Sequence, residues 1–116
     1  MDHQDLARRR LFAQRLAGAP LRTPEAVVRH LGAVQAQERL GAKWAIARRC
    51  PGVTSADLDQ ALADGRLLRT HVLRPTWHVV APADLRDWLA LSAPRVKAMN
   101  ASYDKVVGVD DALAAR

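Results

Sequence analysis

Two glutamines one residue apart, Gln35 and Gln37, are the side chains of this sequence whose spacing points most directly to chemistry. If the backbone is extended there, successive side chains alternate between faces, so both amides would point the same way and could share one small molecule. On a helix they would diverge. An amide offers one acceptor and two donors and does not titrate, so the pair can orient a water or read a nucleotide edge but cannot act as a general base. The alternative is that both amides are solvated or only hold a loop in place.

A second set of polar side chains follows a strand-like alternation further along the chain. Arg74, Thr76 and His78 alternate with apolar residues, which predicts a half-buried strand with a cation, a hydroxyl and an imidazole on one face. Such a face could hold a phosphate, or it could be an ordinary solvated surface. Pro75 cannot donate to a ladder, so we expect its strand to lie at an edge or to carry a bulge there.

The residues just before this segment show the same period of two. Leu68, Thr70 and Val72 alternate with Arg69 and His71. The two segments together predict a β-hairpin on a body that is otherwise helical.

Two helices have clear start and stop signals. Thr23 is the expected N-cap of one, with Pro24 at its first position, and Gly32 ends it directly before the glutamine stretch. Thr54 and Asp57 have the spacing of a capping box at the start of the other.

Residues 39–49 predict a helix between these two. Leu40 and Trp44 recur at helical spacing and are expected on its inner face, with Trp44 in the core rather than serving as a stacking platform for a base. Arg39 and Lys43 lie four residues apart on an adjoining edge.

The ends of the chain also read as helical. Residues 5–17 predict one helix, Pro82 opens another, and Ser92 is expected to cap a last one that Gly108 interrupts or ends. The segment 110–116 looks like a helix cut short, so we expect the chain to be the N-terminal fragment of a longer protein.

Composition fits one mainly helical domain with an anionic partner. The chain has 116 residues, 49% of them hydrophobic and 4% aromatic, which suits a single core of closely packed helices. The formal charge of +6 favours a phosphate-bearing partner. The single cysteine, Cys50, excludes an internal disulfide and is expected to be a buried, inert thiol.

Other classes of function find no support in the sequence. The histidines lack paired ligand spacing and no glycine-rich phosphate loop occurs, so we expect no metal and no cofactor. No apolar run reaches the roughly 18 residues of a membrane span, and the start lacks the pattern of a signal peptide. These features predict a cytoplasmic protein with no membrane contact.

Several helices followed by a hairpin with many arginines nearby is the sequence outline of a winged helix-turn-helix. We therefore expect a mainly α fold with a small β-hairpin, organised as one winged-helix domain over residues 1–116. The usual partner of such a module is double-stranded DNA.

Specific residues add a family resemblance to this outline. Residues 34–37 (Val-Gln-Ala-Gln), 44–49 (Trp-Ala-Ile-Ala-Arg-Arg), 68–70 (Leu-Arg-Thr) and 73–78 (Leu-Arg-Pro-Thr-Trp-His) resemble the N-terminal part of the AlkZ-like (YcaQ-like) winged-helix DNA glycosylases. The resemblance covers about residues 8–95. It implies tandem winged-helix modules that hydrolyse the N-glycosidic bond of N-alkylated purines, including crosslinked N7-alkylguanines, without a cofactor.

The resemblance also implies roles for residues. Gln35 and Gln37 fall on the family's catalytic motif, where they would position the attacking water, although Ala36 is smaller than the apolar residue expected between them. Arg74 and His78 would contact phosphate or support the glutamine loop. The full set of expected DNA-binding residues is Arg39, Lys43, Arg69, Arg74, Thr76 and His78.

Two other readings remain open at this level. The chain could be a non-catalytic DNA-binding winged helix such as a transcriptional regulator, or a protein interaction module, because fold does not fix function. If the family's DNA channel is built from several modules, we expect this chain on its own to bind DNA without cutting it.

Overall fold

The glutamine stretch begins as a strand of a three-stranded antiparallel sheet. A computed structural model describes residues 2–74 and 76–114. The strands are β1 (Ala33–Gln35), β2 (Leu68–His71) and β3 (Trp77–Val80), in the spatial order β1-β3-β2. The hairpin of β2 and β3 is as predicted, and β1 adds a third strand, because it pairs with β3 along its whole length.

The helix before β1 explains why that strand starts where it does. In α2 (Pro24–Leu31), the Thr23 hydroxyl accepts a hydrogen bond from the Ala26 amide at 3.1 Å, and Pro24 is the first helical residue, as predicted. Gly32 then adopts a φ of 78°, which side chains disfavour, and this turns the chain out of the helix into β1.

Two further helices complete the body. α3 (Arg39–Ala47) follows the glutamine stretch, and α4 (Ser55–Ala63) starts with the predicted capping box of Thr54 and Asp57. The order α2, β1, α3, α4, β2, β3 is that of a winged helix-turn-helix whose wing is the connection from β2 to β3. The predicted mainly α class is therefore confirmed. The buried core joins these helices to one face of the sheet through Val27, Val28, Val34, Ala36, Ala42, Ile46, Cys50, Leu58, Ala61, Leu67 and Val79.

The inner face of α3 differs from the prediction. Leu40 and Trp44 are 70% and 68% exposed, whereas Ala42 and Ile46 are 5% and 2% exposed. The helix is therefore rotated so that Ala42 and Ile46 enter the core and Trp44 faces outward, and the expectation of a core Trp44 was wrong. Cys50, which follows α3, is fully buried as expected, and this burial, together with the charge of Glu25, raises the pKa of its thiol.

The strands of the hairpin are shorter than predicted. Arg74 and Thr76 lie in the connection between β2 and β3 rather than within a strand, and Leu73 in that connection has a φ of 66°. β3 is the central strand of the sheet and begins at Trp77. Pro75 lies outside the described residues, so the expectation of an edge or bulge at Pro75 itself stays a prediction.

A single long helix replaces the two predicted after the sheet. The short 3-10 helix η1 (Pro82–Asp84) leads directly into α5 (Leu85–Val107). Ser92 does not cap a helix but lies inside α5, where its hydroxyl donates to the Trp88 carbonyl at 2.6 Å. Gly108, in the left-handed conformation, ends α5, and α6 (Asp111–Ala114) follows.

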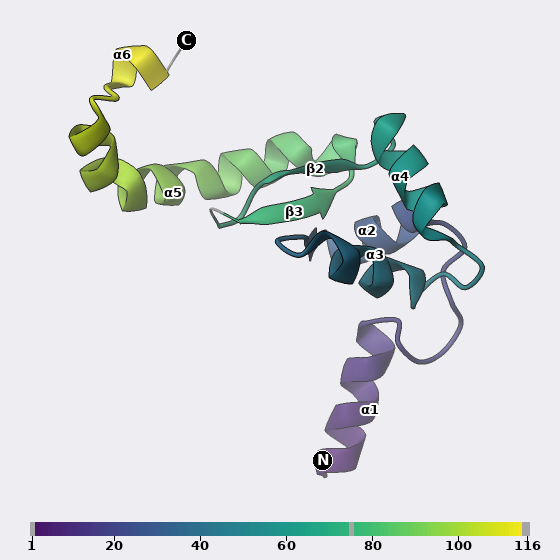
Figure 1. The fold of residues 1–116 in the computed structure, drawn as a ribbon. Helices are drawn as coiled ribbons and strands as arrows, with labels where there is room; N and C mark the ends of the chain where they lie inside the picture. Colours follow the sequence, from purple (N-terminus) through teal and green to yellow (C-terminus); the bar gives the residue numbers. More distant parts are fainter. Residues whose placement is uncertain (1, 75, 115–116) are drawn as a thin grey trace.

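The two ends of the chain project from the body. α1 (His3–Ala13) extends away on one side, and the second half of α5 with α6 extends on another (Figure 1), whereas the first half of α5 lines a hollow together with His71 of β2. α1 is shorter than the predicted 5–17 and has no buried residue. Hydrogen bonds from His30 to the Ala13 carbonyl and from Arg49 to the Gln14 carbonyl, at 2.8 and 2.7 Å, connect its end to the body. None of the helices in the described ranges is long and apolar enough to cross a membrane.

Candidate functional site

Gln35 and Gln37 are both exposed and flank Ala36, which is fully buried. The strand β1 includes Gln35, and the register that pairs Gln35 with His78 on β3 continues one residue further, because the Ala36 amide donates to the Trp77 carbonyl at 2.7 Å. Of the two backbone conformations considered from the sequence, the stretch up to Ala36 therefore has the extended one. The small Ala36 fits because its methyl group enters the core cluster of the body.

The two amides differ in what they already contact. The Gln37 amide oxygen accepts a hydrogen bond from the Trp77 backbone N–H at 3.3 Å, so its NH₂ group remains available as a donor. Within residues 2–74 and 76–114, the Gln35 amide makes no hydrogen bond and keeps both its acceptor and its donors. The pair therefore offers an acceptor from Gln35 and donors from both residues.

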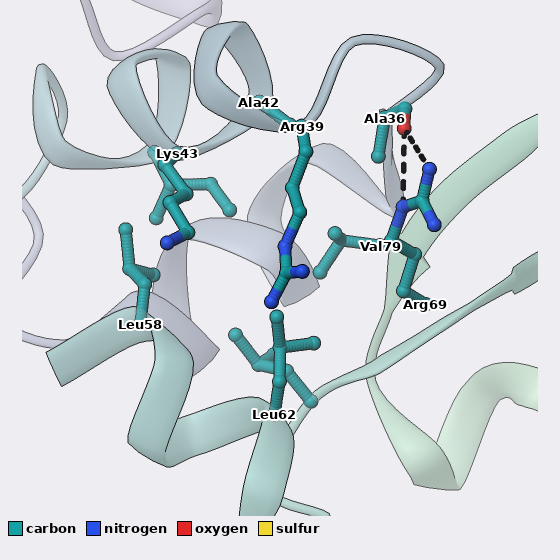
Figure 2. A pocket seen from close by; sticks show the side chains of 10 residues that line it. Ala36, Arg39, Ala42, Lys43, Leu58, Leu62, Arg69 and Val79 are labelled. Carbon is teal, nitrogen blue, oxygen red and sulfur yellow. Dashed lines mark hydrogen bonds between the residues drawn. The ribbon is translucent and has the colours of Figure 1, made fainter. Parts of the chain in front are cut away.

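The backbone between the two glutamines is fixed by an arginine. Arg69 donates from Nε and one terminal nitrogen to the Ala36 carbonyl oxygen, at 3.2 and 2.9 Å (Figure 2). Its guanidinium carbon lies 4.3 Å from the centre of the Trp77 ring, a cation–π distance. Arg69 is half-buried and comes from β2, two strands away from β1.

Three of the predicted DNA-binding cations lie around one small cavity. Arg39, Lys43 and Arg69 line it together with apolar residues of α3, α4 and the sheet (Figure 2). Its volume of about 10 Å³ has room for a water at most, so a nucleobase cannot enter it. The cavity is therefore a small gap in the packing between α3, α4 and the sheet. A ligand could contact the cationic side chains around it but could not enter it.

Two of these cations share one carboxylate. Asp59 on α4 accepts from Arg39 at 3.1 Å and from Lys43 at 2.7 Å, and Lys43 also donates to the Ser55 hydroxyl. The hydrogen bond from Lys43, and then the charges of Lys43 and Arg39, lower the pKa of Asp59. The Arg39 side chain is 60% exposed, against 13% for Lys43, so Arg39 is the more accessible of the two to an incoming phosphate.

The first turn of α3, next to Gln37, is already capped. Both carboxylate oxygens of Glu38 accept hydrogen bonds from backbone amides, at Leu40 and at Gly41. These amides would otherwise be free to bind an anion at the helix N-terminus. A phosphate near the glutamines must therefore be held by side chains and not by this helix end.

Of the remaining predicted residues, Arg74 and Thr76 lie in the wing and His78 lies in β3, and none of them lines that cavity. Arg74 is exposed and, with His71 and residues of α5, lines a hollow of about 400 Å³. The Thr76 hydroxyl is buried and has no hydrogen-bond partner in the described part of the chain. His78 is only 5% exposed, with Nδ1 2.9 Å from the Thr76 carbonyl. Of the two roles expected for His78, this burial favours support of the glutamine stretch over phosphate contact.

Sequence reasoning missed three residues of the site. Trp77 counts as an apolar residue in the strand pattern, and the family resemblance gives it no role, yet its amide, carbonyl and ring all contact the glutamine stretch or Arg69. Asp59 is 16 and 20 residues from its two partners, and Trp88 is 56 residues from Gly32, so no local spacing could have revealed either contact. Among the residues described, no three His, Cys, Asp or Glu side chains are grouped so that they could hold a metal ion.

Comparisons with known proteins identify a family and a similar solved structure. The model of the family "DNA glycosylase AlkZ-like" matches residues 28–116, which include both glutamines. The solved structure of the Streptomyces sahachiroi DNA glycosylase AlkZ is similar with a TM-score of 0.77 and 26% sequence identity, over 90% of this chain. The similarity covers 28% of that protein's chain, so the present chain matches less than a third of it. A search of curated proteins gave no match.

Proposed function

The chain belongs to the AlkZ-like DNA glycosylase family, and we propose that it contributes the water-positioning glutamines of a monofunctional glycosylase that removes N-alkylated purines, such as N7-alkylguanine, from double-stranded DNA. The observation that carries this proposal is the pair of exposed amides on either side of a buried, fixed Ala36, within the matched residues. The single thiol, Cys50, and the lack of a membrane-length helix in the described ranges are compatible with a cytoplasmic enzyme.

Uncharged side chains are sufficient for this reaction. Alkylation at N7 leaves the guanine with a formal positive charge, so the base departs readily when the bond from N9 to C1′ of the sugar breaks. The electron pair of that bond moves to the base and neutralises its charge. Water then attacks C1′ of the oxocarbenium-like sugar and loses a proton to solvent. A site that holds the water close to C1′ lowers the activation free energy of the attack, because the reacting atoms are already in position.

The two amides divide the work of holding that water. Gln35 has its oxygen free, so it accepts a hydrogen bond from the water and turns the lone pair of the water toward C1′. Gln37 has its oxygen bound by the Trp77 amide and therefore presents N–H donors, either to the water or to an oxygen of the damaged nucleotide. Neither glutamine accepts the proton that the attacking water loses. This step therefore requires no ionisable side chain in the site.

Positively charged side chains near Gln35 and Gln37 could bind the phosphates of a DNA strand that passes beside the two glutamines. Arg39 stands close after Gln37 in the sequence, and Arg74 is exposed on the wing. Phosphate contacts by such residues position a protein on DNA without reading its sequence. In this proposal Arg39, Lys43 and Arg74 contact the phosphates, while His78 supports β1 from the opposite strand.

One observation argues against the reading of a sequence-specific regulator. In a winged helix the second helix of the helix-turn-helix, here α4, enters the major groove. The α4 segment Ser55–Ala63 carries Asp57 and Asp59 and has no arginine or lysine. Its exposed side would repel phosphates, so this module is poorly suited to reading bases through that helix.

Base release by the complete gene product tests the proposal. Single-turnover release of N7-methylguanine from duplex DNA should fall about 100-fold in Gln35→Ala and in Gln37→Ala, because each removes a positioning group. Gln4→Ala, at an exposed glutamine on α1, is the matched control and should leave the rate unchanged. Unchanged release in both site variants, or no release by the wild type, would overturn the proposal.

A further inference from the structure

We infer that Arg69 is a positioning residue for the glutamine pair: by holding the Ala36 carbonyl it keeps both amides presented to the water, and it is not a phosphate contact. The inference deepens the proposed function and rests on it. It replaces the role that the sequence suggested for Arg69, which was DNA binding.

The hydrogen bonds around Ala36 depart from an ordinary strand ladder at one point. In an antiparallel hydrogen-bonded pair, the two residues exchange both of their N–H to carbonyl bonds. Ala36 and Trp77 make only one of them, from the Ala36 amide to the Trp77 carbonyl at 2.7 Å. The Trp77 amide donates instead to the Gln37 side chain, and the Ala36 carbonyl accepts instead from Arg69.

Because of these changed hydrogen-bond partners, the conformation of Gln35 and Gln37 depends on Arg69. Two N–H groups of the guanidinium converge on the one carbonyl that has left the ladder, so the Ala36 carbonyl oxygen is kept from the Trp77 amide. The vacated Trp77 amide is then free to bind the Gln37 oxygen. Without Arg69, the buried Ala36 carbonyl would regain a partner most easily by turning back to Trp77, and that would displace the Gln37 side chain.

The shape of arginine matters here as well as its charge. A planar guanidinium can stack on the Trp77 ring and donate from its edge to a carbonyl at the same time, whereas a lysine ammonium has no such plane. Arg69 reaches across β3 from β2, so the ring of Trp77 supports it along the way. Lysine at this position would keep the positive charge but could not reproduce both contacts.

Arg69→Lys therefore separates the two roles. A phosphate contact needs mainly a positive charge, which lysine supplies, whereas the clamp on Ala36 needs the planar fork. In the complete gene product we expect Arg69→Lys to keep the wild-type affinity for undamaged duplex DNA, and the same dependence of that affinity on salt. We expect its single-turnover release of N7-methylguanine to fall about 100-fold, because the amides are misplaced. Arg29→Lys, at an exposed arginine of α2 that has no role in the proposed site, is the matched control and should keep both properties.

A second measurement does not require base release. Hydrogen exchange of the Ala36 and Trp77 amides, measured by NMR relative to the Val79 amide in the core, should become at least about 10-fold faster in Arg69→Lys if the clamp is lost. Wild-type exchange at both amides would overturn the clamp. Faster exchange with an unchanged rate of base release would overturn its role in positioning. Loss of DNA affinity in Arg69→Gln together with full activity and affinity in Arg69→Lys would establish a phosphate contact instead. If the wild type releases no base, the proposed function fails, and the exchange data still decide whether the clamp exists.

Discussion

The indole N–H of Trp88 on α5 donates to the carbonyl oxygen of Gly32 at 3.1 Å, and the same ring lies against the glycine itself. A Cβ added at Gly32 would stand 2.9 Å from Trp88 Cζ2. Gly32 is the residue that turns α2 into β1, so this contact ties the long helix to the start of the glutamine strand. Space and backbone conformation both call for glycine there.

Gly32→Ala should therefore destabilise the protein by more than about 1 kcal/mol, because alanine must adopt a φ of 78° and also displace the Trp88 ring. Gly52→Ala is the matched control, since Gly52 has a φ of 90° but nothing within 4 Å of its added Cβ. Free energies of unfolding from urea titration measure both. Equal losses in the two variants would show that the Trp88 contact contributes nothing beyond backbone strain.

The orientation of α3 predicts opposite effects for two neighbouring positions. Ile46→Ala should cost about 2–5 kcal/mol of the free energy of unfolding, because Ile46 is 2% exposed and its loss leaves a cavity. Trp44→Ala should change it by no more than about 0.5 kcal/mol, since that side chain is 68% exposed. A larger loss for Trp44→Ala than for Ile46→Ala in the same urea titration would mean that the helix presents its other side to the core.

Asp59 should limit DNA binding by occupying two cations. Asp59 partly neutralises Arg39 and Lys43 and competes with phosphates for them, and Asp59→Asn removes that charge, so both cations can contact phosphates in full. Affinity for duplex DNA should rise, and the slope of its logarithm against log salt should steepen by as much as about 1.8, or 0.9 per added contact. Asp64→Asn removes the same charge at the end of α4, where Asp64 pairs with Arg66, and serves as the control. Identical changes in the two variants would contradict a direct role for Arg39 and Lys43.

Stability should decline on the acid side. The pKa of Asp57 is lowered by hydrogen bonds from the Thr54 hydroxyl and amide, and that of Asp59 first by the hydrogen bond from Lys43. A carboxyl with a lowered pKa in the folded state stabilises the protein above its unfolded pKa of about 3.9, and this contribution is lost as the pH falls through the folded value. Urea midpoints should therefore be steady near neutrality and drop below about pH 4. The drop should be smaller in a double variant, Asp57→Asn with Asp59→Asn, and an equal drop would contradict these assignments.

Features set by neighbours in the sequence were predicted well. The caps at Thr23 and Thr54, the turn at Gly32 and the hairpin of β2 and β3 each depend on residues within a few positions, so their patterns indicate structure directly.

Features set by distant contacts were not predicted. Leu40 and Trp44 have the spacing of an inner face, but the sheet and α4 pack on the side that carries Ala42 and Ile46. Serine is a common N-cap residue, but the Ser92 hydroxyl donates a hydrogen bond to the Trp88 carbonyl, and α5 continues through Pro94. The three-residue β1 is too short to show a period, and only its pairing with β3 makes it a strand. The clamp of Arg69 on Ala36 joins residues 33 positions apart, so it too had no local signal.

The outer strands of the sheet are β1 and β2, of three and four residues, on either side of a central strand of four. Edges as short as these expose few unpaired backbone groups, which protects the protein from edge-to-edge aggregation. They also leave little room for a partner to bind by adding a strand of its own. Binding at the edge strand β1 must therefore depend on side chains. Single substitutions of these side chains should change binding while the sheet stays folded.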